Sequence, residues 1–186
     1  MVSVTQLWLP ILVAAVLVFL ASSVIHMVLG YHAGDYKKVP REDDAMAALR
    51  PFNLAPGDYC MPRAGSMGEM KNPEYQKKWA AGPVVFFTVM PNGKPEMGAQ
   101  FIGWFLYSLF IGLTAAYVTG LAYGPGTDYM HIFRMATTVA FIGYVGALPT
   151  FSIWYKRSWR TTLVGMMDGL VYGMLTAGTL GWLWPR

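Results

Sequence analysis

The segment that decides the fold is residues 161–184, which read TTLVGMMDGLVYGMLTAGTLGWLW and carry a single charged side chain, Asp168. A helix needs about 20 consecutive, mostly apolar residues to cross a hydrocarbon core of about 30 Å. In lipid, a spanning segment must satisfy its own backbone hydrogen bonds, and a helix does so. The sequence therefore predicts a transmembrane helix over 161–184.

Small residues recur at every fourth position along this segment and along residues 99–122. The two repeats consist of Gly165, Gly169, Gly173, Ala177 and Gly181 in the first, and of Ser108, Gly112, Ala116 and Gly120 in the second. Small residues at this spacing let membrane helices approach closely, which matters because lipid removes the hydrophobic drive for helix association. The repeats predict two helix-packing faces, either within the chain's own bundle or against a second copy or a partner subunit.

Two further segments have the same character and complete a predicted four-helix membrane bundle. Residues 7–29 contain one ionisable group, His26, and residues 131–155 contain Pro149, which should kink the helix or end it early. The composition agrees, since 55% of the residues are hydrophobic and 13% are charged, against about 25% charged in a soluble domain. This balance argues against a soluble globule and against a disordered chain.

The first segment also has features of a cleaved signal peptide. Ala21-Ser22-Ser23 is an acceptable small-residue cleavage site. However, residues 1–6 carry no Lys or Arg, and the apolar stretch continues beyond Ser23. We therefore expect a retained first helix.

The distribution of Lys and Arg predicts the orientation of the bundle. Of the 14 basic residues, 12 fall in the loops 30–98 and 151–160, which share one side of the membrane if all four helices cross. Cytoplasmic loops are enriched in Lys and Arg. We therefore expect the large loop in the cytoplasm and both termini on the outer side. The net charge of +4 is then a consequence of topology, and no nucleic-acid partner is expected.

Residues 30–98 are predicted to form a small cytoplasmic α+β subdomain. Its candidate elements are helices at 40–50 and 73–81 and strands at 58–61 and 83–90. The alternative for 83–90 is a dip into the membrane surface. Glu42, Asp43 and Asp44 lie in the first turn of the first helix, where the helix dipole favours carboxylates, so we interpret them as capping residues and not as metal ligands.

Motifs for catalysis or cofactor binding are absent from the sequence. The single cysteine, Cys60, excludes an intrachain disulfide and a two-thiol site. A bis-histidine haem is disfavoured because His26 and His131 are predicted at opposite ends of the bundle, about 30 Å apart. His26 and His32 are six residues apart and do not share a helix face. We therefore expect no cofactor, no metal and no enzymatic activity.

His26 and Asp168 are predicted to form an intramembrane polar pair. Asp168 is the only carboxylate inside the four segments. A charge at the centre of a membrane helix costs about 2.5–3.5 kcal/mol, so such a residue usually has a partner. In the predicted orientation the two residues lie near the same membrane face, at depths that differ by about 6 Å. A structural hydrogen bond, a proton- or ion-handling site and the absence of any contact all remain open.

Four stretches near the two ends of the chain carry a family resemblance: SSVIHMV at 22–28, Tyr31-His32, DGLVY at 168–172 and GWLWP at 181–185. They resemble an uncharacterised family of small multi-pass proteins of the bacterial inner membrane. The resemblance implies a multi-pass protein of the bacterial cytoplasmic membrane, whose outer-side termini are then periplasmic. It carries no activity and no site residues.

Two functions are compatible with these features. The first is a non-enzymatic accessory, assembly or scaffolding subunit of a membrane complex. Its partners would be the lipid bilayer and, through the glycine-rich faces, a second copy or another membrane subunit. The alternative is a small oligomeric transporter or channel with His26 and Asp168 in its path.

Overall fold

A computed structural model describes residues 1–186 and divides the chain into two compact units. The first unit comprises Met1–Lys37 and Glu96–Arg186, and the second comprises Lys38–Pro95. The chain is mostly helical, and the first unit holds four helical segments that are long and apolar enough to cross a membrane. These segments are Val4–Met27, Gly98–Ala122, Tyr129–Tyr155 and Trp159–Trp182. The prediction of four apolar helices and a small sheet is confirmed.

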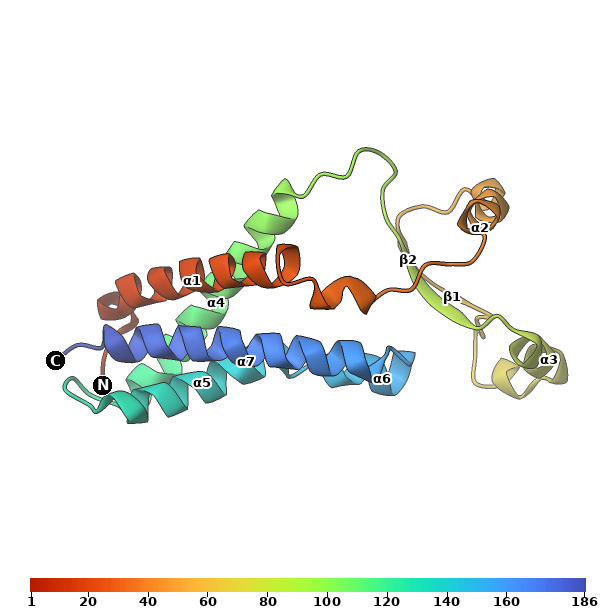
Figure 1. The fold of residues 1–186 in the computed structure, drawn as a ribbon. Coiled ribbons are helices and arrows are strands. Elements are labelled where there is room, and N and C mark those ends of the chain that lie inside the picture. Colours follow the sequence, from red (N-terminus) through yellow and green to blue (C-terminus); the bar gives the residue numbers. More distant parts are fainter. The chain divides into compact units, whose positions relative to one another are not determined.

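The first unit is a bundle in which one helix lies in a central position. Its helices are α1 (Trp8–Met27), α4 (Gly98–Ala122), α5 (Tyr129–Val145), α6 (Leu148–Tyr155) and α7 (Trp159–Trp182). Figure 1 shows α7 between α1 and α5, and α7 packs against both. Helix α4 crosses the others obliquely and packs against α1 and α5.

The third apolar segment is interrupted near its end. Helix α5 is capped by Gly146, and α6 begins at Leu148 with Pro149 in its first turn. Proline lacks an N–H group, so it fits the first turn of a helix and breaks the interior. The predicted kink or early end at Pro149 is therefore confirmed, with the break immediately before the proline.

The glycine repeat of α7 packs against α5 of the same chain. A Cβ atom on Gly169 would overlap with Val145 Cγ1, and one on Gly181 would lie 2.7 Å from Tyr129 Cδ2. Gly173 faces the α5 backbone, where a Cβ atom would lie 3.3 Å from the Phe141 nitrogen. Glycine is therefore required for the close approach of these two helices.

The repeat of α4 packs against the N-terminal part of the chain. A Cβ atom on Gly112 would lie 3.6 Å from the Ile11 carbonyl oxygen, and one on Gly120 would overlap with the Val2 carbonyl. Ser108 is buried in the same bundle. Both predicted packing faces are thus used within the chain, which is one of the two alternatives that the sequence left open.

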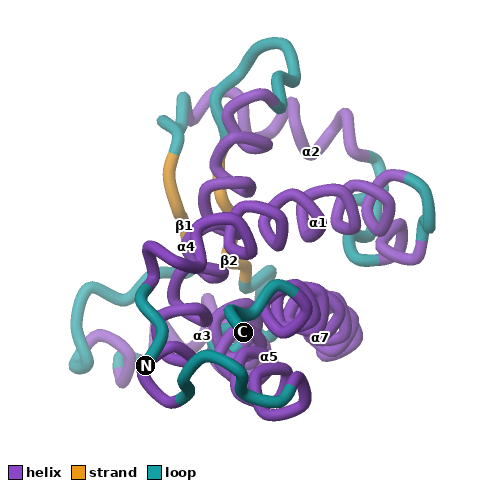
Figure 2. The backbone as a smooth tube through the Cα atoms, turned by 90° about the vertical axis from the view of Figure 1, so that its left-hand side faces the viewer, coloured by secondary structure: helices purple, strands orange, loops and turns teal.

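Both termini and the α4–α5 loop meet at one end of the bundle, which Figure 2 views head-on. The Val2 amide donates a hydrogen bond to the Gly120 carbonyl at 2.9 Å, and the Gly126 amide donates to the Pro185 carbonyl at 2.9 Å. The Trp184 indole donates to the Gly124 carbonyl at 3.0 Å. The two termini therefore share one end of the bundle, as four alternating helices require.

The compartment that this end faces is open to a direct test. A topology reporter fused after residue 70 or after residue 158 should report the cytoplasm, and one fused after Arg186 should report the periplasm. The physical reason is the retention of Lys- and Arg-rich loops on the cytoplasmic side. A periplasmic signal at residue 70 would contradict the orientation expected from the sequence.

The second unit is a small α+β fold. Its helices are α2 (Glu42–Leu49) and α3 (Pro73–Ala81), and its antiparallel strands are β1 (Gly57–Met61) and β2 (Val85–Val89). The Asn72 side chain accepts a hydrogen bond from the Glu74 amide at 2.8 Å and caps α3. All four predicted elements of this unit are present, and 85–89 is a paired strand.

Candidate functional site

The chain turns immediately after α1 and brings a second histidine back to the first. Helix α1 ends at Met27, and Gly30 adopts a φ of +64°, a left-handed conformation that glycine accepts readily. A short 3₁₀ helix, Tyr31–Gly34, follows. The centroids of the His26 and His32 rings lie 4.4 Å apart. The expectation that a six-residue spacing keeps these two histidines apart is therefore wrong. That spacing rule applies within one helix, and α1 ends between His26 and His32.

His32 lies between two carboxylates. Its Nδ1 atom is 2.7 Å from Asp35 Oδ2, and its Nε2 atom is 2.9 Å from Asp168 Oδ2. The first contact is a hydrogen bond. The second lacks hydrogen-bond geometry, so Nε2 is buried without a hydrogen-bond partner. Asp168 is itself deeply buried, with 6% of its side chain exposed.

The other oxygen of the Asp168 carboxylate accepts a hydrogen bond from the Tyr31 hydroxyl. Partial burial, this hydrogen bond and the negative charge of Asp168 together raise the pKa of Tyr31 from 10.0 to about 12. The phenol is therefore protonated at neutral pH and can act as the donor. Tyr31 and His32, adjacent in sequence, thus contact the two oxygens of one buried carboxylate, Tyr31 through a hydrogen bond and His32 through a close approach of Nε2.

Arg160 ties the turn after α1 to the start of α7. One guanidinium nitrogen, Nη1, lies 3.4 Å from Asp35 Oδ1, and Nη2 donates a hydrogen bond to the Tyr31 carbonyl at 3.2 Å. Its positive charge partly balances the carboxylate of Asp35, which in turn orients His32. The turn is therefore held at three points: by Asp35, by the Tyr31 backbone and by Asp168.

The side chains of His26, His32 and Asp168, here called the His–Asp cluster, bring three metal-ligating atoms within 4.8 Å of one another. His26 makes no hydrogen bond within the chain, and its side chain is accessible. The predicted partners His26 and Asp168 are thus brought into one cluster. The side chains that contact Asp168 directly, however, are those of Tyr31 and His32. The sequence analysis did not identify either residue as a partner of Asp168.

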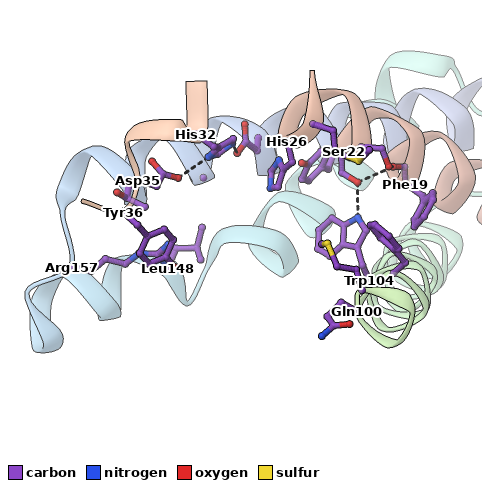
Figure 3. A pocket seen from close by; sticks show the side chains of 18 residues that line it. Phe19, Ser22, His26, His32, Asp35, Tyr36, Gln100, Trp104, Leu148 and Arg157 are labelled. Atoms are coloured by element: carbon purple, nitrogen blue, oxygen red, sulfur yellow. Dashed lines mark hydrogen bonds and ion pairs between the residues drawn. The ribbon is translucent and has the colours of Figure 1, made fainter. Parts of the chain in front are cut away.

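A cavity of about 750 Å³ lies beside the His–Asp cluster, within the first unit. Figure 3 shows His32, Asp35 and Arg157 on one side of His26. On the other side lie Phe19 of α1 and Trp104 of α4. The Phe101 ring also lines the cavity and lies 6.2 Å from the Phe19 ring, and these three residues are here called the aromatic end of the cavity. The Trp104 indole donates a hydrogen bond to Ser22 Oγ at 2.7 Å and is thereby held against α1. The charged side chains of Asp35 and Arg157 therefore lie at one end of the cavity, together with Tyr36 and Leu148, and the aromatic rings lie at the other end, together with Gln100 (Figure 3).

Comparisons of the chain with protein-family models, with curated proteins and with solved structures found no match. The chemistry of the cluster and the shape of the cavity are therefore the basis for inferring function.

Proposed function

We propose that this protein binds an amphipathic small molecule within the membrane. The polar head of the ligand would lie at the His–Asp cluster, and its apolar part would lie at the aromatic end of the cavity. The observation that carries this proposal is a single cavity that joins a polar cluster, built around the buried carboxylate of Asp168, to an aromatic lining.

The physical properties of the cavity support a binding role. Small-molecule sites are mostly apolar cavities of about 300–1,000 Å³ with a few well-placed polar groups. Ionisable residues inside membrane helices are costly and usually serve a function. Here Asp168 is buried in an apolar helix and also lines the cavity. The same residue that is costly to insert is thus available to a ligand.

The two functions expected from the sequence stay predictions. The accessory-subunit role was motivated by the glycine-rich faces, but Gly169 and Gly173 pack against α5 of the same chain. They therefore do not favour a partner subunit. The transporter alternative used His26 and Asp168, and both line the cavity. A ligand site of this kind is a component that a transporter would share.

Filling the cavity tests the proposal. Gly165 lines the cavity, and a Cβ atom there would meet only Leu148 Cδ1, at 3.4 Å. Gly165→Phe should therefore occupy the ligand's space. In extracts of the protein purified in mild detergent, mass spectrometry should find about one copy of one small molecule per wild-type chain. The amount should fall at least tenfold in Gly165→Phe.

The matched control is Gly103→Phe. Gly103 is also in a membrane-length helix, but a Cβ atom there would meet nothing within 4 Å. This variant should retain the molecule at the wild-type amount. If all three proteins carry the same mixture of membrane lipids in equal amounts, the cavity holds only bulk lipid and the proposal is wrong.

A further inference from the structure

We infer that His26, His32 and Asp168 form a binding site for a divalent transition-metal ion of the first row, such as Zn²⁺ or Fe²⁺. The inference goes beyond the proposed small-molecule binding and depends only on the geometry of the His–Asp cluster. Two imidazole nitrogens and one carboxylate oxygen are a donor set that these ions prefer. Calcium and magnesium, by contrast, take sites built of oxygen atoms.

The spacing of the three side chains suits one shared ion. Zinc binds imidazole nitrogen at about 2.0–2.1 Å and carboxylate oxygen at about 2.0–2.2 Å, so ligand atoms around a tetrahedral ion lie about 3.4 Å apart. His32 Nε2 and Asp168 Oδ2 are 2.9 Å apart, and all three ligand atoms lie within 4.8 Å of one another. His26 has no hydrogen bond to break, so its ring can rotate toward the ion.

The contact between His32 and Asp168 is incomplete without a cation. Because Nδ1 of His32 faces the Asp35 carboxylate at 2.7 Å, Nδ1 carries a proton in the neutral ring. Nε2 then has a lone pair 2.9 Å from a carboxylate oxygen. Two acceptors at this distance repel each other. A proton on Nε2 would remove the repulsion, but the contact lacks hydrogen-bond geometry. A metal ion would satisfy both atoms.

The surroundings of the cluster match the outer shell of metal sites. A metal-bound histidine almost always donates its other N–H to a carboxylate, a carbonyl or water, and ligating carboxylates are hydrogen-bonded in turn. Here Asp35 is the carboxylate beside the other ring nitrogen of His32, and the Tyr31 hydroxyl donates the hydrogen bond to the Asp168 carboxylate. Without a metal, Asp35 is paired with the Arg160 guanidinium, whereas Asp168 forms no ion pair with a Lys or Arg side chain and has only His32 beside it. A divalent cation is electrostatically favoured there.

The ligand set also leaves room for a further ligand. Zinc sites that do chemistry or bind small molecules use three protein ligands and keep a fourth position open. All three residues of the His–Asp cluster line the cavity. An ion held by these three residues would therefore lie at the wall of the cavity.

Cobalt(II) is the probe for this site, because its visible spectrum reports both binding and ligand geometry. The full-length protein is purified in mild detergent through a tag without histidine, treated with a chelator and titrated with Co²⁺. We expect one Co²⁺ per chain, displaced by Zn²⁺. His26→Ala and His32→Ala should each weaken binding by at least about 100-fold. Asp35→Asn should weaken it by about 10–100-fold, as outer-shell changes do.

His131→Ala is the matched control. This third histidine lies in the first turn of α5, where it is exposed and 3.9 Å from Asp128. Removing it should leave the Co²⁺ spectrum and affinity unchanged. No Co²⁺ binding, binding that survives both His26→Ala and His32→Ala, or binding lost equally in His131→Ala would each overturn the inference.

Misfolding of a histidine variant, and a failure of the proposed small-molecule binding, can both be told apart from a failure of the metal site. His26 makes no hydrogen bond, so His26→Ala should keep the wild-type elution profile and melting temperature, and its Co²⁺ titration remains decisive. If metal binding fails in wild-type protein that still carries a small molecule, the metal site alone is wrong. If Co²⁺ binds as expected but no small molecule copurifies, the proposed function alone is wrong.

Discussion

Gly169→Leu should destabilise the bundle more than any other single substitution along the α7 repeat. A Cβ atom at this position would overlap with Val145 Cγ1 and lie 3.2 Å from Tyr144 Cβ, so even the first added atom forces α5 and α7 apart. Inserting extra methylene groups into a packed core costs about 1–3 kcal/mol, and more where the backbone must move. A leucine here should exceed that range. Thermal unfolding in mild detergent, followed by loss of the monodisperse elution peak, measures the effect.

The control is the same substitution at an open position. Gly103→Leu places a leucine on α4 where nothing lies within 4 Å of the new Cβ atom. It should melt close to the wild-type temperature. Equal melting temperatures for the two leucine variants would show that α5 and α7 do not pack at Gly169.

Tyr31→Phe should remove the hydrogen bond that anchors the turn after α1 to α7. The acceptor is the buried carboxylate of Asp168. A hydrogen bond to a charged group contributes about 1.5–3 kcal/mol, and a buried group left without its partner adds to the loss. We therefore expect Tyr31→Phe to lower the free energy of unfolding by about that amount, as measured by denaturant or thermal unfolding in detergent.

A double-mutant cycle isolates this interaction from the other effects of the substitutions. Asp168→Leu removes the acceptor and also the cost of burying a charge, so its own effect on stability combines two opposing contributions. In the Asp168→Leu background, Tyr31→Phe should cost much less than in the wild type. In Asp168→Asn, which keeps an acceptor oxygen, part of the cost should remain. Effects of Tyr31→Phe and Asp168→Leu that simply add would mean that the two side chains do not interact.

The elements of the fold were predictable because their signals are local. An apolar run long enough to cross a membrane becomes a helix whatever surrounds it, since lipid leaves the backbone no other hydrogen-bond partners. The cap at Asn72 and the break before Pro149 likewise depend on a few neighbouring residues. The strand at 85–89 followed from its β-branched and aromatic composition and from the turn after it. The strand at 57–61 was the weaker candidate, and the pairing of the two strands was not predicted.

The packing faces were predictable, but their partners were not. A four-residue repeat of small side chains shows which face of a helix can approach another closely. It carries no information about which helix approaches. In the structure, the α7 repeat meets α5, whereas the α4 repeat meets α1 and the segment before it. Only the arrangement of all the helices decides this.

Only some residues of the candidate site could be identified from the sequence. His26 and Asp168 were identifiable because polar residues are rare and costly inside apolar segments. Tyr31, His32, Asp35 and Arg160 lie outside those segments, where polar residues are ordinary and no local rule distinguishes them.

The contacts of these four residues depend on two features of the tertiary structure that helix rules do not predict from sequence. The first is the left-handed turn at Gly30, which folds His32 back beside His26. The second is the packing of α7 against α1, which places Asp168 and Arg160 against residues more than a hundred positions earlier in the chain. The sequence by local chemistry therefore identified His26 and Asp168 as costly to bury. Which side chains lie beside these two residues depends on the packing of the whole bundle, so only the tertiary structure shows it.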